Sequence, residues 1–263
     1  MLYLLFWLEA ALVTGLLYRF IPALHPAWIL PILIGAFLTF CLLFVLYLMA
    51  TSAMFSKKPP EKPNRFALLT VRLALPWFTS LLGVRLRVKG KEKLPATHAV
   101  YVANHRSAFD PVFVMSAFGR RRTAFVSKLS VAKYPFIGPY MNACGYVFID
   151  RDSPMQSMRA LQRAAKYVKE SRINYGIFPE GTRSKDGRLL PFKSGAFVLA
   201  KKADVPIAVM KIEGSENALS FRFPRVTVTV LDVIPVEEVR ALTPDALSER
   251  SRAMMEAALS KKQ

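Results

Sequence analysis

Residues 98–110 read His98-Ala-Val-Tyr-Val-Ala-Asn-His-Arg-Ser-Ala-Phe-Asp110, and this stretch decides the fold of the 263-residue chain. Its first half is apolar and typical of a buried strand, whereas its second half is a polar turn that holds His105 and leads to Asp110. In α/β proteins the loops that follow the strands carry the functional side chains. The stretch therefore predicts a strand over residues 98–103 and a candidate site directly after it.

Short β-forming runs and longer helical patterns alternate over about 200 residues around this stretch. The predicted strands cover residues 84–88, 98–103, 124–126, 175–178, 206–211 and 226–231. This alternation predicts a single α/β domain with a mixed, largely parallel sheet flanked by helices, rather than a sandwich or a helical bundle.

The clearest helix is expected over residues 153–171. Ser153 is a suitable N-cap, and Pro154 suits the first helical position. The helical period places four residues on one apolar stripe, namely Met158, Leu161, Ala165 and Val168. A terminal helix is expected over residues 246–259.

The first 56 residues form a different kind of segment, with Glu9 and Arg19 as their only charged residues. Residues 28–50 are almost wholly apolar and long enough to cross a hydrocarbon core of about 30 Å. A second apolar stretch over residues 1–18 precedes a turn with two prolines. The sequence predicts a membrane-anchoring helical hairpin over residues 1–56, with a cleavable signal peptide as the alternative. Whether the first helix spans or lies in the interface stays open.

Residues 57–65 are basic and rich in proline, so they predict a short linker over the membrane surface. Basic clusters beside apolar helices stay on the cytoplasmic side, which predicts that the α/β domain, residues 66–263, faces the cytoplasm. The whole formal charge of +19 lies in residues 57–263, because the first 56 residues hold one of the 37 basic and one of the 18 acidic residues.

The composition excludes several classes of protein. With 53% apolar residues the chain is too hydrophobic for a disordered polyelectrolyte. Its two cysteines, Cys41 and Cys144, provide neither a disulfide scaffold nor paired metal ligands, so we expect no metal. A pI near 10.2 leaves a membrane-anchored nucleic-acid-binding protein as an alternative. The sequence has no motif typical of that class, so no nucleic-acid partner is expected.

Asp110 follows His105 by five residues. On one continuous helix this separation would turn the two side chains apart, so a contact requires His105 on the loop and Asp110 in the first turn of the next helix. The carboxylate would then accept a hydrogen bond from one imidazole nitrogen and raise the basicity of the other, as a general base requires. The alternative is that Asp110 only caps a helix before Pro111.

Two further loops after β-like runs each hold an arginine, Arg151 in residues 145–151 and Arg183 in residues 178–184. A guanidinium forms bidentate hydrogen bonds with phosphate, and Gly181 allows close backbone approach to a ligand. These loops predict a phosphorylated substrate. The alternative is surface ion pairing.

In these ordered motifs the sequence resembles the glycerolipid acyltransferases of the bacterial lysophosphatidic acid (1-acylglycerol-3-phosphate) acyltransferase type. The family's Asn-His-x4-Asp block resembles Asn104, His105 and Asp110, and its Gly-x-x-Phe-Ile-x-Arg block resembles Gly145, Phe148, Ile149 and Arg151. Its Phe-Pro-Glu-Gly-Thr-Arg-Ser block is matched throughout residues 178–184. A fourth block, an apolar run ending in Pro-Val, is met only partly by residues 205–210, where the second proline is missing.

The resemblance implies a membrane enzyme that transfers a fatty acyl group from an acyl thioester to 1-acylglycerol 3-phosphate, giving phosphatidic acid. It implies that His105 is the general base, that Asp110 orients it and that no acyl-enzyme forms. Substrate binding is implied for Asn104, Lys128, Arg151, Glu180, Gly181, Thr182 and Arg183. The implied donor is acyl-coenzyme A or acyl carrier protein, without a further cofactor.

Other interpretations stay open. Ser107 lies close to His105 and offers a covalent route. The acceptor could instead be glycerol 3-phosphate, a lyso-ornithine lipid or another lysophospholipid, and the protein could be a lipid-binding scaffold without catalysis.

A basic face is expected to attract anionic lipid and phosphate-rich donors, with a merely solvated surface as the alternative. Its residues are Lys57, Lys58, Arg120, Arg121, Arg122, Arg159, Arg163 and Lys166.

Overall fold

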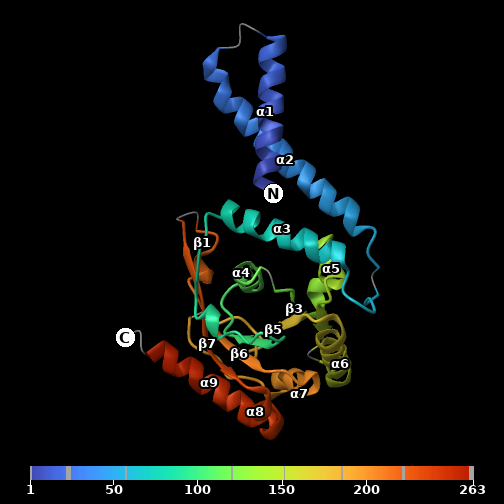
Figure 1. Ribbon diagram of the computed structural model, residues 1–263, viewed down its shortest axis with the longest axis vertical. Helices are drawn as coiled ribbons and strands as arrows, with labels where there is room; N and C mark the ends of the chain where they lie inside the picture. The colour runs from blue at the N-terminus through green and yellow to red at the C-terminus, as the bar shows by residue number, and fades with distance from the viewer. Residues whose placement is uncertain are drawn as a thin grey trace.

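The computed structural model describes residues 2–21, 25–56, 58–119, 121–150, 152–184, 186–220 and 223–260. An α/β domain lies below a protruding pair of N-terminal helices (Figure 1). Three positions named above, Lys57, Arg120 and Arg151, lie outside the described residues, as does Pro22, one of the two prolines in the predicted turn.

A seven-stranded sheet forms the centre of the domain, in the order β1-β7-β6-β2-β5-β3-β4. The strands are β1 (Arg85–Lys89), β2 (Val100–Ala103), β3 (Thr123–Lys128), β4 (Val147–Ile149), β5 (Asn174–Ile177), β6 (Ile207–Glu213) and β7 (Arg225–Ile234). Strands β2 to β6 share one direction, whereas β7 pairs antiparallel with β6 and β1 runs parallel to β7. The predicted mixed, largely parallel sheet is confirmed.

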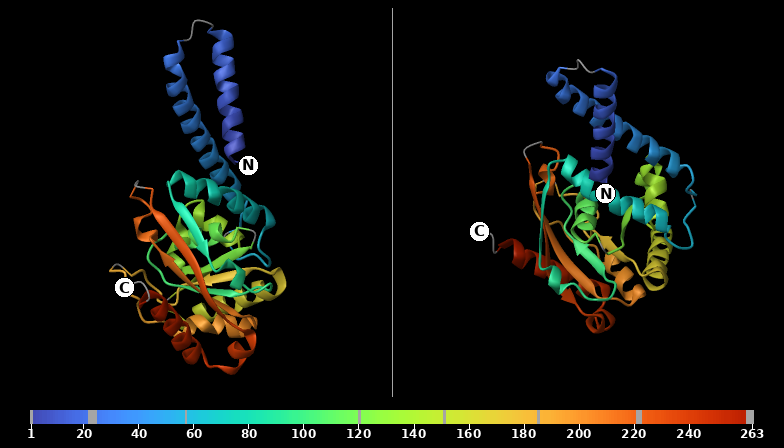
Figure 2. Two further views of the ribbon diagram at one scale, coloured as in Figure 1. Left: turned by 60° about the vertical axis from the view of Figure 1, so that its left-hand side comes forward. Right: turned by 45° about the horizontal axis from the view of Figure 1, so that its top comes forward.

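Helices cover both faces of this sheet (Figures 1 and 2). The helices of the domain are α3 (Arg65–Leu81), α4 (Asp110–Ala117), α5 (Ile137–Ala143), α6 (Pro154–Ser171), α7 (Val198–Ala203), α8 (Val236–Ala241) and α9 (Pro244–Ser260). Helices α3 and α4 lie on one face, and α7, α8 and α9 lie on the other (Figure 1). Short 3-10 turns cover Pro26–Trp28, Lys91–Lys93, Leu129–Lys133, Ser194–Phe197 and Ser215–Asn217.

Helix α6 begins as the sequence predicts. The Ser153 hydroxyl accepts a hydrogen bond from the N–H of Gln156, and Pro154 is the first helical residue. Leu161, Ala165 and Val168 are buried against the core, but Met158 is 40% exposed, so its inclusion in the apolar stripe was wrong.

Helix α3 continues through Pro76. The missing N–H of Pro76 leaves the carbonyl of Arg72, four residues earlier, without its helical donor. The Pro76 ring is exposed, and its own carbonyl accepts hydrogen bonds from the hydroxyls of Thr79 and Ser80. Asn64 caps the helix by accepting from the N–H groups of Phe66 and Ala67.

The proline-rich linker is held by the domain. The side-chain amide of Asn142 donates to the carbonyls of Ser56 and Lys58, both at 2.9 Å, and the Tyr167 hydroxyl donates to the Pro60 carbonyl. The linker therefore follows α5 and α6. Because its prolines prevent a regular helix, its backbone carbonyls have no helical donors and accept hydrogen bonds from these side chains.

Helices α1 (Leu2–Phe20) and α2 (Ile29–Ser52) lie side by side as a hairpin (Figure 2). Of the described helices, α2 alone is long and apolar enough to cross a membrane, with a mean hydropathy of 2.8 over 18 residues. Phe40 and Phe44 of α2 pack edge-to-face on Trp77 of α3, with ring centroids 5.7 and 5.3 Å apart. The hairpin is thereby docked on α3.

Further along α2, side chains bind the domain directly. The hydroxyl of Thr51 lies 2.5 Å from that of Tyr140 in α5, and Tyr47 lies 3.3 Å from Thr70 of α3. The second half of α2 is therefore fixed to the domain, and its first half projects away (Figure 2).

Candidate active site

The candidate site lies where the parallel strands end. Because β6, β2, β5, β3 and β4 are neighbours and run in one direction, the loops that follow them open at the same edge of the sheet. His105 follows β2, Glu180 and Arg183 follow β5, and Lys128 ends β3. The fold thus brings together at one edge motifs that are far apart in the sequence.

His105 and Asp110 are in direct contact. The imidazole Nδ1 lies 2.8 Å from Asp110 Oδ2, and the Asp110 side chain is fully buried as the first residue of α4. Oδ2 also accepts from the backbone N–H groups of Arg106 and Ser107, at 2.7 and 2.8 Å. Asp110 therefore holds the turn and orients the imidazole at the same time, so the two interpretations of this residue are compatible.

This contact determines the tautomer of His105. An ionised carboxylate only accepts hydrogen bonds, so Nδ1 carries the proton and donates it to Asp110. Nε2 has no hydrogen-bond partner among the described residues, and the side chain is 19% exposed. The free nitrogen is the basic one, and its lone pair is available to take a proton from a bound hydroxyl.

The ring plane of His105 is fixed by stacking. The Phe178 ring lies parallel to the imidazole, with centroids 4.2 Å apart and an interplanar angle of 13°. Phe125 of β3 stacks on the other side of Phe178, at 5.6 Å and 12°. In the sequence, Phe178 opens the motif of residues 178–184, but no role was predicted for it. A contact with His105 could have been expected, because both residues directly follow predicted parallel strands.

Glu180 joins the two principal loops. Its side chain is only 3% exposed, and its Oε1 accepts from the N–H of His105 at 2.8 Å, while Oε2 accepts from the N–H of Leu190 at 3.1 Å. Burial raises the pKa of this carboxyl, and the two backbone hydrogen bonds oppose the rise. Both oxygens are thus engaged within the protein, although the resemblance implied a contact with substrate.

Asn104 is likewise engaged within the protein. Its side-chain oxygen accepts from the N–H of Ile212 at 2.7 Å, and its amide donates to the Ile212 carbonyl at 2.9 Å. The side chain therefore takes the place of a backbone group and extends the pairing of β2 with β6. Asn104 thereby holds the start of the His105 loop, a role that the resemblance did not imply.

The glycine-arginine turn after β5 is open to solvent. Gly181 has φ +68°, and its N–H donates to the Phe178 carbonyl at 3.0 Å. Thr182 and Arg183 are exposed, and within the described part of the chain the Arg183 guanidinium makes no hydrogen bond or ion pair. Lys193 passes over this turn, its Nζ 3.3 Å from the point where a Cβ on Gly181 would stand. Arg183 is available for an anion.

The resemblance implies two other basic residues for the site. Lys128 is exposed at the end of β3, two strands from His105. Arg151 lies outside the described residues, directly after the short strand β4 and Asp150.

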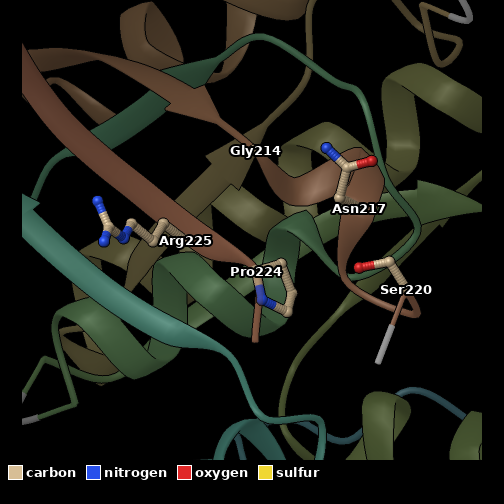
Figure 3. A pocket seen from close by; sticks show the side chains of 5 residues that line it. All are labelled: Gly214, Asn217, Ser220, Pro224 and Arg225. Carbon is tan, nitrogen blue, oxygen red and sulfur yellow. The ribbon is translucent and has the colours of Figure 1, made fainter. Parts of the chain in front are cut away.

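Arg106 ties the His105 loop to the β6–β7 connection, which sequence reasoning missed. Its guanidinium lies 3.2 Å from Glu216 Oε1. Beside this connection a pocket of about 520 Å³ opens (Figure 3). Its lining residues are Gly214, Asn217, Ser220, Pro224 and Arg225.

The fourth, partly matched block lies in the core. Residues Ile207 to Met210 of β6 are fully buried between β2 and β7. This part of the block contributes packing, and it offers no exposed apolar surface to an acyl chain.

Taken together, the carboxyl edge of the parallel sheet in this α/β protein carries a buried aspartate in contact with a partly exposed histidine, and an exposed arginine on the neighbouring loop. The family model described as Acyltransferase matches residues 85–213, which span β1 to β6 and all of these side chains. Over these residues the predicted resemblance to acyltransferases is confirmed.

The chain is similar to proteins named 1-acyl-sn-glycerol-3-phosphate acyltransferase. That of Limnanthes douglasii is 34% identical over 161 residues, 59% of this chain and 56% of the relative, so little more than half of that relative is spanned. That of Salmonella typhimurium is 29% identical over 207 residues, 77% of this chain and 82% of the relative. The crystal structure of the 1-acyl-sn-glycerophosphate (LPA) acyltransferase PlsC from Thermotoga maritima has a TM-score of 0.55 and 25% identity, and it covers 73% of this chain and 79% of its own.

Proposed function

We propose that the chain is a membrane-bound acyltransferase that moves a fatty acyl group from an acyl thioester to the free hydroxyl of 1-acylglycerol 3-phosphate, giving phosphatidic acid. The contact between His105 and Asp110 is the observation that carries this proposal, because it leaves one basic nitrogen free. The names of the relatives support the acceptor.

In the proposed reaction His105 Nε2 takes the proton of the acceptor hydroxyl as its oxygen attacks the thioester carbonyl carbon. The new C–O bond forms, the C–S bond breaks, and the imidazolium returns the proton to the leaving thiolate. Asp110 stabilises the imidazolium between these steps. No acyl-enzyme is required, and His105 and Asp110 are the proposed catalytic residues.

The acceptor phosphate is proposed to bind Arg183, which has no partner among the described residues, with Gly181 and Thr182 forming the turn around it. A guanidinium binds phosphate through two parallel charge-assisted hydrogen bonds. Lys128 and Arg151 follow neighbouring strands and are proposed to add positive charge at the same edge. Asn104 and Glu180 act as positioning residues, because their polar atoms bind the backbone.

The donor is proposed to be acyl-coenzyme A or acyl carrier protein, which needs no further cofactor in this step. Both donors carry phosphate, so the strongly basic domain favours their approach.

The proposed division of the chain is a membrane-anchoring hairpin over residues 1–56, a linker over 57–65 and the catalytic domain over 66–263, with the domain on the cytoplasmic face. Because α2 docks on Trp77 from Phe40 onward, only about 16 Å of it projects, at 1.5 Å per residue from Ile29. This is about half of a hydrocarbon core, so we propose that the hairpin enters one leaflet. A His25→Cys variant should then stay unlabelled by an impermeant maleimide added on the far side of the membrane, and labelling there would indicate a span.

A panel of acceptors tests the function. Detergent-purified protein is given labelled acyl-coenzyme A or acyl carrier protein with lysophosphatidic acid, glycerol 3-phosphate, lyso-ornithine lipid and other lysophospholipids. We expect phosphatidic acid as the dominant product. A different dominant product would show that the acceptor is another molecule, while the proposed acyl transfer would stand. Label that stays covalently on the protein in the absence of acceptor would indicate a covalent route through Ser107.

A further inference from the structure

A second concave site lies on the face of the domain that carries α3 and α4. Its cavity of about 260 Å³ is bounded by one flank of α3, by Met115 of α4 and by the connection from α4 to β3. We call it the arginine slot, and its lining residues are Arg65, Leu68, Leu69, Val71, Arg72, Leu75, Met115, Gly119, Arg121, Arg122 and Thr123.

The two walls of the arginine slot carry the same charge. Arg65 and Arg72 come from α3, Arg121 and Arg122 come from the connection to β3, and no carboxylate lines the cavity among the described residues. Within that part of the chain none of the four guanidinium groups takes part in an ion pair. Four unpaired positive charges around one cavity repel one another, and an anion between them removes this repulsion.

Beneath the arginines the slot is apolar. Leu68, Val71 and Leu75 recur at spacings of three and four along α3, so they share one flank of the helix, and Met115 faces them from α4. A small inorganic anion would use only the charged rim. An amphiphile with an anionic head and an apolar body would use both parts of the slot.

The position of α3 indicates where such an amphiphile comes from. Trp77 on another side of α3 holds the apolar hairpin, and Phe66 and Leu69 on its outer surface are 46% and 51% exposed. An exposed apolar surface directly beside a membrane hairpin lies at the bilayer interface. Helix α3 lies directly beneath the hairpin (Figure 2), so with the hairpin in the bilayer the arginines of α3 would lie near the lipid headgroups.

We propose that the arginine slot binds an anionic membrane phospholipid, with its phosphate on Arg65, Arg72, Arg121 and Arg122 and its apolar part along Leu68 and Leu75. The slot is separate from the candidate active site. Asp110 begins α4, and Gly119 lies beyond its end, about 12 Å away for eight residues of helix. The bound lipid holds the domain at the bilayer surface and takes no part in the acyl transfer. This inference therefore does not depend on the proposed reaction.

The test measures lipid binding to the full chain in a neutral detergent. Short-chain phosphatidylglycerol is titrated by calorimetry against short-chain phosphatidylcholine, and inorganic phosphate is added as a competitor. Arg72→Gln/Arg122→Gln takes one exposed arginine from each wall. Arg159→Gln/Arg163→Gln on α6 removes the same charge from elsewhere on the basic face.

We expect phosphatidylglycerol to bind the wild type and the α6 variant alike, and to bind the slot variant roughly tenfold or more weakly. An equal loss of phosphatidylglycerol affinity in both variants would indicate diffuse electrostatic attraction and overturn the proposal. Binding of phosphatidylcholine to the wild type as tightly as phosphatidylglycerol would also overturn it. Competition by phosphate at lipid-like concentrations would show a free-anion site instead. Retained binding in Arg183→Gln, which removes the proposed acceptor-phosphate contact, would separate this site from the acceptor site.

Discussion

The carboxylate of Glu180 accepts a hydrogen bond from the backbone N–H of His105 at 2.8 Å, across a separation of 75 residues in the sequence. The residue that opens the glycine-arginine turn thus fixes the backbone of the proposed general base. The Ser184 N–H returns a hydrogen bond to the His105 carbonyl at 2.9 Å. Proton transfer and phosphate binding therefore depend on one rigid pair of loops.

The burial of Glu180 predicts a pH-dependent contribution to stability. Burial raises the pKa of Glu180 in the folded state above its ordinary value of 4.5. The neutral form is therefore favoured by folding, and its contribution is fully present below the unfolded pKa and is lost as pH rises through the folded pKa. Chemical unfolding of wild type and Glu180→Gln between pH 4 and 7 should show the wild type losing free energy of unfolding relative to the variant. A relative gain with rising pH would contradict the assignment.

Asn104 should matter for stability more than for substrate affinity. Asn104→Ala leaves the buried N–H and carbonyl of Ile212 unpaired, so the free energy of unfolding should fall by roughly 1–3 kcal/mol. Asn104→Asp keeps the side-chain oxygen that accepts from Ile212, so its free energy of unfolding should fall less. Unfolding curves and KM for the acceptor are measured together. A large rise in KM with unchanged stability would restore the substrate contact that the sequence motif implied.

Removal of the aromatic stack should slow turnover without abolishing it. A stacked aromatic pair contributes about 0.5–1.5 kcal/mol, so Phe178→Ala should lower kcat by up to roughly tenfold while KM changes little. Phe178→Tyr keeps the ring and serves as the control. If Phe178→Ala has wild-type kcat, the stack does not orient the imidazole.

Arg183 should act through acceptor binding. Arg183→Gln removes an exposed guanidinium without an internal partner in the described structure, so stability should be unchanged and KM for the acceptor should rise roughly tenfold or more. Arg188→Gln is the matched control, because Arg188 lies in the following loop but pairs with Asp186 at 2.8 Å. An equal effect of both variants would indicate general electrostatic attraction.

Much of the architecture could be predicted from hydrophobic periodicity. All six expected strands are present, and the strand before His105 lies near the centre of the sheet. Strand β4 was not among them, because three residues are too few to show a period, although its motif was noted as β-like. The path of the linker depends on donors from Asn142 and Tyr167, about 80 to 100 residues away, which no local pattern reveals.

The site was only partly predictable for the same reason. The geometry required for His105 and Asp110 follows from their spacing, and the structure has that geometry. The contacts of Asn104 with β6 and of Glu180 with the His105 loop are set by strand order, which the sequence does not specify. Motif residues that hold the backbone and those free to bind a ligand look alike until the strands are placed.

The central claim is that the free Nε2 of His105 removes the proton of the acceptor hydroxyl. Its most direct test is single-turnover transfer of a labelled acyl group to lysophosphatidic acid by wild type and His105→Ala, at saturating acceptor and donor. Loss of a general base should slow the chemical step by roughly 100- to 10,000-fold, with acceptor binding retained. Transfer by His105→Ala at the wild-type rate would contradict the account.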